Sequence, residues 1–64
     1  MTTDQIDARV QRILITAIEA RGEHVVPTFS IWNAFVPFIA EQDRIAAAER
    51  YADTISPGWR QYTQ

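Results

Sequence analysis

Side chains that commonly perform acid–base or nucleophilic chemistry are sparse in this chain of 64 residues. His24 is the only histidine, and its neighbours Glu23 and Val25 offer no converging catalytic partner. Ser30 and Ser56 lie outside any nucleophile-elbow pattern, so neither is expected to react with the help of His24. We interpret His24 as a loop residue, and we expect a protein that is not an enzyme and has no catalytic residue.

Acidic side chains gather in the second half of the chain, at Glu41, Asp43, Glu49 and Asp53. Paired carboxylates can transfer protons or bind divalent cations. Glu49 and Asp53, however, form one like-charge pair on a predicted helix face, and no second pair within the segment 37–55 has this spacing. The chain has no cysteine, which excludes zinc sites built from thiolates. The sequence therefore predicts a solvated acidic face with no metal and no cofactor.

Arg9 and Arg12 form the basic patch of the first predicted helix. A chain of this length, with three predicted helices, has the size of a helix-turn-helix DNA reader. The segment that would enter the DNA groove, residues 37–55, carries four acidic residues against two arginines, so phosphates would repel it. A small DNA-binding transcriptional regulator that uses Arg9 and Arg12 is therefore the alternative function, and nucleic acid is not the expected partner.

The composition is typical of one small globular domain, residues 1–64, with residues 57–64 as a short C-terminal tail. The chain is 47% hydrophobic and 22% charged, with a net charge of −2. The longest uncharged run, residues 25–40, is interrupted by Pro27 and Pro37 and is shorter than the roughly 20 residues of a membrane-spanning helix. We expect a cytoplasmic protein with no membrane span.

The first helix is predicted over residues 3–21. Thr2 or Thr3 can cap its start, and Gly22 can end it in the left-handed conformation. Its apolar residues recur at the spacing of one helical stripe, which comprises Ile6, Val10, Ile13, Leu14, Ala17 and Ile18.

A second helix is predicted to begin after a Thr28 cap, with Pro27 and Trp32 in the positions of a hydrophobic staple. Pro37 should kink or break it, because an interior proline removes a backbone hydrogen bond. A third helical segment is expected from about residue 37 to residue 55, with an apolar seam made of Phe38, Ile45, Ala48, Ala52 and Ile55. The predicted fold class is all-α, a small bundle of two to three helices that is completed by dimerisation.

Residues 25–40 carry more aromatic surface than a 64-residue monomer easily buries, and no charge. This surface can be core, a protein interface or an interfacial membrane segment, but the last usually needs a basic face that is missing here. We expect an accessory, adaptor or regulatory protein that forms a homodimer with twofold symmetry, binds a larger protein, or does both. The expected partner-binding residues are Phe29, Trp32, Phe35, Phe38, Trp59 and Tyr62.

Overall fold

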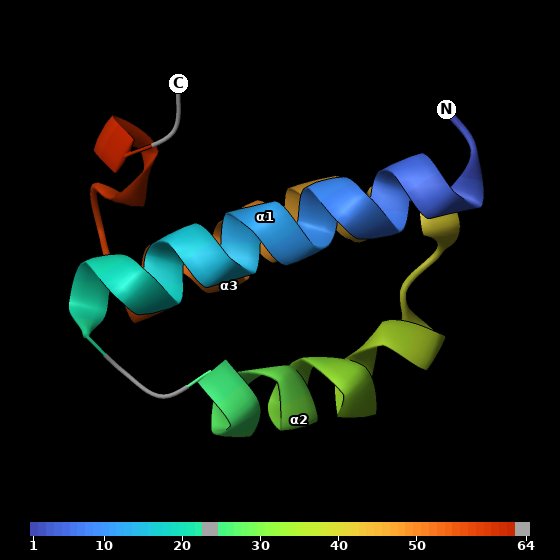
Figure 1. Ribbon diagram of the computed structural model, residues 1–64. Helices are drawn as coiled ribbons and strands as arrows, with labels where there is room; N and C mark the ends of the chain where they lie inside the picture. The colour runs from blue at the N-terminus through green and yellow to red at the C-terminus, as the bar shows by residue number, and fades with distance from the viewer. Residues whose placement is uncertain (23–24, 63–64) are drawn as a thin grey trace.

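The computed structural model describes residues 1–22 and 25–62, with the backbone alone for residues 25–27. It contains three α-helices, α1 (Thr3–Arg21), α2 (Val25–Phe35) and α3 (Arg44–Ile55), and three short 3₁₀ turns, η1 (Val36–Phe38), η2 (Glu41–Asp43) and η3 (Trp59–Tyr62) (Figure 1). No strand occurs in the described ranges, which confirms the predicted all-α bundle. His24 lies outside the described residues.

Helix α1 has the predicted boundaries and caps. The Thr2 hydroxyl accepts a hydrogen bond from the Gln5 amide at 3.2 Å, and the Thr2 amide donates to Oε1 of Gln5 at 2.9 Å. This capping box satisfies backbone donors that have no partner inside the helix. At the other end, Gly22 has a φ of 80°, a left-handed conformation that glycine adopts without steric cost.

Helix α2 begins at Val25, whereas a Thr28 cap would place its first residue at Phe29. The expected cap is therefore wrong, and Thr28 is instead a buried residue inside the helix. The earlier start is possible because Pro27 is the third helical residue, where the backbone N–H has no partner within the helix. The helix ends at Phe35, and Pro37 lies in the separate turn η1, so the predicted break is confirmed.

The segment after Pro37 differs from the predicted helix over residues 37–55. Ile39 and Ala40 have ψ angles of 125° and 143°, outside the helical region, and α3 begins only at Arg44. Here the chain turns back from the end of α2 to the start of α1 (Figure 1), which a continuous helix could not do. A 2.7 Å hydrogen bond from the Thr3 hydroxyl to Oε1 of Glu41 joins η2 to the start of α1.

The core lies between α1 and α3, which run side by side. Ala48 and Ala52 have no exposed surface, so the two helices approach closely along these small side chains. Ile55 completes the buried face of α3, but Phe38 does not belong to the predicted seam because it is 87% exposed. On the α1 side the whole predicted stripe is buried, namely Ile6, Val10, Ile13, Leu14, Ala17 and Ile18.

Helix α2 and the turn η3 lie on opposite sides of the α1–α3 pair (Figure 1). The Trp32 ring of α2 stacks on the Tyr51 ring of α3, with centroids 6.2 Å apart and planes 12° from parallel. On the other side, Trp59 of η3 is buried against the pair, and Gly58 before it has a φ of 91°. The α1–α3 pair is therefore the middle layer of the molecule.

Candidate interaction surfaces

Helix α2 carries no charge and has apolar residues on two sides. Its inner side contributes Trp32, which is buried, and the partly buried Phe29, which packs against the core. Its outer side presents Ile31 and Phe35 at i, i+4 spacing, and Phe38 follows three residues later in η1. These three side chains are 49%, 59% and 87% exposed, and we call them the apolar outer face.

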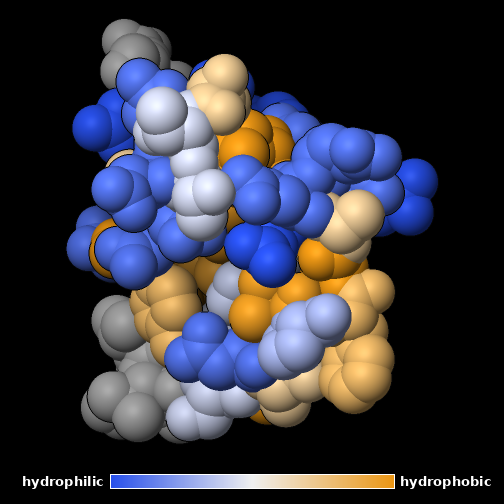
Figure 2. All heavy atoms as spheres, turned by 90° about the vertical axis from the view of Figure 1, so that its right-hand side faces the viewer, coloured by the Kyte–Doolittle hydropathy of each residue, from blue (hydrophilic) through white to orange (hydrophobic). Residues whose placement is uncertain are grey.

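The apolar outer face is a local concentration of hydrophobic surface. Figure 2 shows apolar residues gathered on the lower part of the molecule, where α2 and η1 lie, below a largely hydrophilic upper part. Ser30, Asn33 and Ala34 are also exposed on α2 and carry no charge. Large apolar side chains grouped in this way often mark a protein interface.

The six predicted partner-binding residues occupy three different environments. Phe35 and Phe38 lie together on the apolar outer face, whereas Phe29 and Trp32 face the core of the same chain. Trp59 is buried and Tyr62 is 69% exposed in η3, on the other side of the molecule. Ile31 is not among the predicted partner-binding residues, although its spacing to Phe35 and Phe38 is visible in the sequence.

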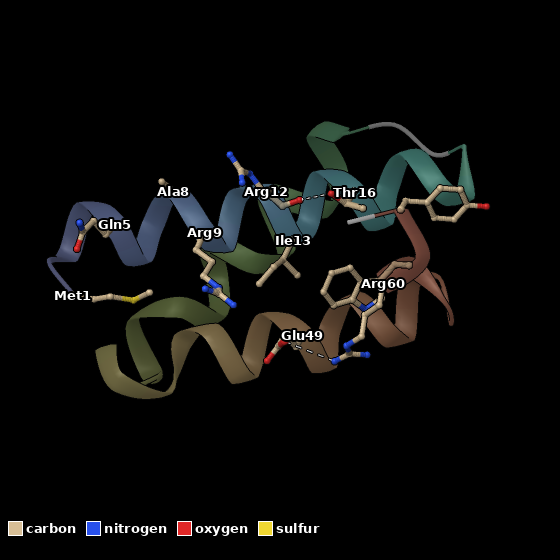
Figure 3. A pocket seen from close by; sticks show the side chains of 11 residues that line it. Met1, Gln5, Ala8, Arg9, Arg12, Ile13, Thr16, Glu49 and Arg60 are labelled. Carbon is tan, nitrogen blue, oxygen red and sulfur yellow. Dashed lines mark hydrogen bonds and ion pairs between the residues drawn. The ribbon is translucent and has the colours of Figure 1, made fainter. Parts of the chain in front are cut away.

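A second surface feature is an open groove of about 1080 Å³ on the side of the α1–α3 pair away from α2 (Figure 3). One wall is α1, which contributes Arg9 and Arg12, and the opposite wall includes Glu49 of α3. The buried residues Ile13 and Trp59 also line it, so its base is apolar. Arg9 extends from α1 toward α3, whereas Arg12 points to the outer side of α1 (Figure 3).

Hydrogen bonds and ion pairs fix the turn η3 at one end of this groove. The indole Nε1 of Trp59 donates to Oδ1 of Asp53 at 2.8 Å, and Nη1 of Arg60 donates to the same oxygen at 2.7 Å. The Arg60 guanidinium also lies 4.7 Å from the Trp59 ring centroid and 3.8 Å from Oε2 of Glu49. Both members of the predicted acidic pair, Glu49 and Asp53, thus bind Arg60.

The other acidic residues singled out from the sequence do not converge on a metal-type site. Glu41 accepts the hydrogen bond from Thr3, and Asp43 precedes α3 without a side-chain capping bond. Within the ranges that the structure describes, no group of three or more histidine, aspartate or glutamate side chains could hold a metal ion. None of the described helices is long and apolar enough to cross a membrane.

Comparison with known proteins found no family model, no curated protein and no solved structure that matches this chain significantly.

Proposed function

We propose that the protein is a small protein–protein interaction module that pairs with a second copy of itself through the apolar outer face. The observation that carries the proposal is the exposure of Ile31, Phe35 and Phe38 at helical spacing on an uncharged segment. Large apolar and aromatic side chains dominate the buried centres of interfaces, where charges are depleted.

A second copy fits this face because twofold pairing brings the same surface of each chain together. A charged residue on the face would then lie near the same charged residue of the second copy and be repelled by it. Residues 25–40 contain no charged residue. Phe35 and Phe38 together keep on the order of 300 Å² of side-chain surface exposed. A standard interface takes roughly 800 Å² from each partner, and the neighbouring exposed residues Ser30, Asn33 and Ala34 would supply part of the remainder.

In this proposal the module acts as an accessory, adaptor or regulatory subunit, by binding rather than by catalysis. The absence of cysteine from the sequence supports a cytoplasmic location, where disulfides are rare. A larger protein is the alternative occupant of the same face.

Sedimentation equilibrium at micromolar concentration tests the proposal. The wild-type chain should have twice its chain mass of 7.3 kDa. The double variant Phe35→Ser/Phe38→Ser should sediment as a monomer and keep its helical circular dichroism, because both side chains are exposed and contribute little to the core.

Tyr62→Ser is the matched control, since it also removes an exposed aromatic ring but on the opposite side of the molecule. It should leave the dimer intact. A monomeric wild-type chain would overturn self-association, and a dimer that only Tyr62→Ser dissociates would move the interface to η3.

A further inference from the structure

We infer that the groove lined by α1, α3 and η3 binds an acidic, amphipathic peptide segment of a partner protein. This site lies on the side of the α1–α3 pair opposite α2 (Figure 3), and no residue of α2 lines it. It therefore remains open when the apolar outer face is covered, and the inference does not depend on the proposed dimer.

One wall of the groove carries positive charge. Arg9 and Arg12 lie three residues apart on α1, both are exposed, and neither forms an ion pair with a carboxylate in the described part of the chain. A carboxylate of a bound segment would complement Arg9, which extends from α1 toward α3 (Figure 3), with a hydrogen bond that is stronger because both groups are charged. Arg12 points to the outer side of α1, so a second carboxylate would contact it only at the outer edge of the groove.

The base of the groove between these charges and η3 is apolar. Ile13 and Trp59 are 6% and 3% exposed there, and Tyr62 at the rim is 69% exposed. Tyrosine is enriched at interfaces because its ring gives apolar contact while its hydroxyl stays in water. An aliphatic or aromatic side chain of the bound segment can therefore pack beside Tyr62, over the base formed by Ile13 and Trp59.

The groove is elongated and runs along α1. Its lining residues on α1 run from Gln5 to Thr16, a helical length of about 17 Å. This length corresponds to about five residues of extended chain. A groove that is open along its length suits a peptide better than a small molecule, which is normally enclosed on most sides.

The opposite wall argues against nucleic acid as the occupant. Glu49 lies on α3 across from Arg9 and would repel a second row of phosphates (Figure 3). Nucleic acid affinity depends on many phosphate contacts, whereas this groove provides two arginines that form no ion pair in the described residues. An amphipathic peptide needs negative charge on one side only, and that side would face α1.

Selection from a display library of random short peptides tests the inference and does not require the natural partner to be identified. Peptides that bind the wild-type protein should be enriched in aspartate and glutamate and should carry a large apolar residue. In isothermal titration calorimetry, a selected peptide should bind roughly tenfold or more weakly to Arg9→Glu, and its affinity should fall less for Arg12→Glu.

Arg50→Glu is the matched control, because Arg50 is exposed on α3 and does not line the groove. It makes the same charge change and should leave peptide affinity unchanged. Phe35→Ser/Phe38→Ser should also retain binding, which separates this site from the proposed dimer surface.

Three results would overturn the inference. They are a library that yields no binding peptide, selected peptides without acidic enrichment, and acidic peptides that bind Arg9→Glu as tightly as the wild type. A short duplex DNA that binds the wild type and is lost in Arg9→Glu, with no peptide selected, would assign the groove to nucleic acid instead.

Discussion

Oδ1 of Asp53 accepts two hydrogen bonds, one from the indole of Trp59 at 2.8 Å and one from Arg60 at 2.7 Å. One carboxylate oxygen of α3 thus holds two consecutive residues of the C-terminal turn. The Trp59 ring is buried beneath Arg60, so the turn combines apolar burial with a charged hydrogen-bond acceptor.

Trp59→Phe tests the contribution of the indole N–H. The phenyl ring keeps most of the buried apolar contact but cannot donate to Asp53, so we expect a loss of about 1–2 kcal/mol in the free energy of unfolding. Urea denaturation at a fixed protein concentration measures it. Tyr62→Phe changes an exposed ring in the same turn and should alter stability by less than about 0.5 kcal/mol. Equal effects of the two variants would contradict the assigned role of the hydrogen bond.

The close contact between α1 and α3 depends on small side chains. Ala48→Leu inserts three carbon atoms where no surface is exposed, and we expect destabilisation by about 1–3 kcal/mol. Ala46→Leu makes the same change two residues earlier on the same helix, at an exposed position, and should be nearly neutral. Thermal unfolding followed by circular dichroism compares the two. If Ala48→Leu melted at the temperature of Ala46→Leu, the helices would not be packed as described.

The end of α1 requires a left-handed residue. Nothing lies within 4 Å of a Cβ built on Gly22, so a substitution there meets only the backbone penalty of its φ of 80°. Gly22→Ala should destabilise the chain by about 1 kcal/mol. Gly22→Asn should cost less, because asparagine adopts this conformation more readily than other non-glycine residues. In urea denaturation the free energy of unfolding should be highest for the wild type with Gly22, lower for Gly22→Asn and lowest for Gly22→Ala.

The amides of α2 should be the least protected from hydrogen exchange among the three helices. Helix α2 contacts α3 through the Trp32–Tyr51 ring stack, and its outer side is exposed. We expect its amides to exchange hydrogen faster than those of α1, and Tyr51→Ala to accelerate α2 selectively. Tyr51→Phe keeps the stacked ring and removes only the hydroxyl that donates to the Thr28 carbonyl at 3.5 Å, so it should accelerate exchange in α2 less than Tyr51→Ala does. Hydrogen exchange should be measured in the Phe35→Ser/Phe38→Ser variant, because a second copy would not cover α2 there. Uniform acceleration of all helices would contradict this assignment.

Binding at the two proposed surfaces should depend differently on salt. The apolar outer face has no charge, so the dimer dissociation constant should change little with sodium chloride and should fall in sodium sulfate, which strengthens apolar burial. Peptide binding at Arg9 and Arg12 should weaken as ionic strength rises, because exposed charges are screened. Sedimentation and calorimetry over a salt series measure the two constants. A dimer that dissociates in sodium chloride would contradict the assignment of its interface to this face.

Local sequence signals predicted α1 completely. Its apolar stripe, the Thr2 cap and the terminal Gly22 all indicate the same boundaries, and the structure has them. The ends of this helix are determined by interactions among residues close in sequence, so they can be predicted from the sequence alone. The third helical segment was predicted to end at about residue 55, and α3 ends at Ile55.

The segment between α2 and α3 was less predictable because long-range packing determines it. Thr28 has the side chain of a helix cap, but burial against the core and the tolerance of Pro27 in the first turn extended α2 to Val25. The heptad spacing of Phe38 to Ile45 suggested one continuous helix, whereas the return of the chain toward Thr3 requires the extended residues Ile39 and Ala40.

Of the candidate surfaces, the sequence indicated the aromatic segment but not which side chains face outward. Phe29 and Phe35 have the same side chain, and only the position of α2 on α3 makes the first partly buried and the second exposed. The groove was not predicted at all. It forms because Trp59, far from Arg9 in sequence, is brought against α1 by the C-terminal turn.

The two tryptophans occupy separate junctions of the fold, Trp32 where α2 joins α3 and Trp59 where the C-terminal turn meets α1. The fluorescence of each tryptophan therefore reports on one of these two junctions. In Trp32→Phe the indole emission would follow detachment of the turn alone, and in Trp59→Phe it would follow detachment of α2. Stopped-flow traces of the two variants would give the order in which the outer elements leave the central helix pair.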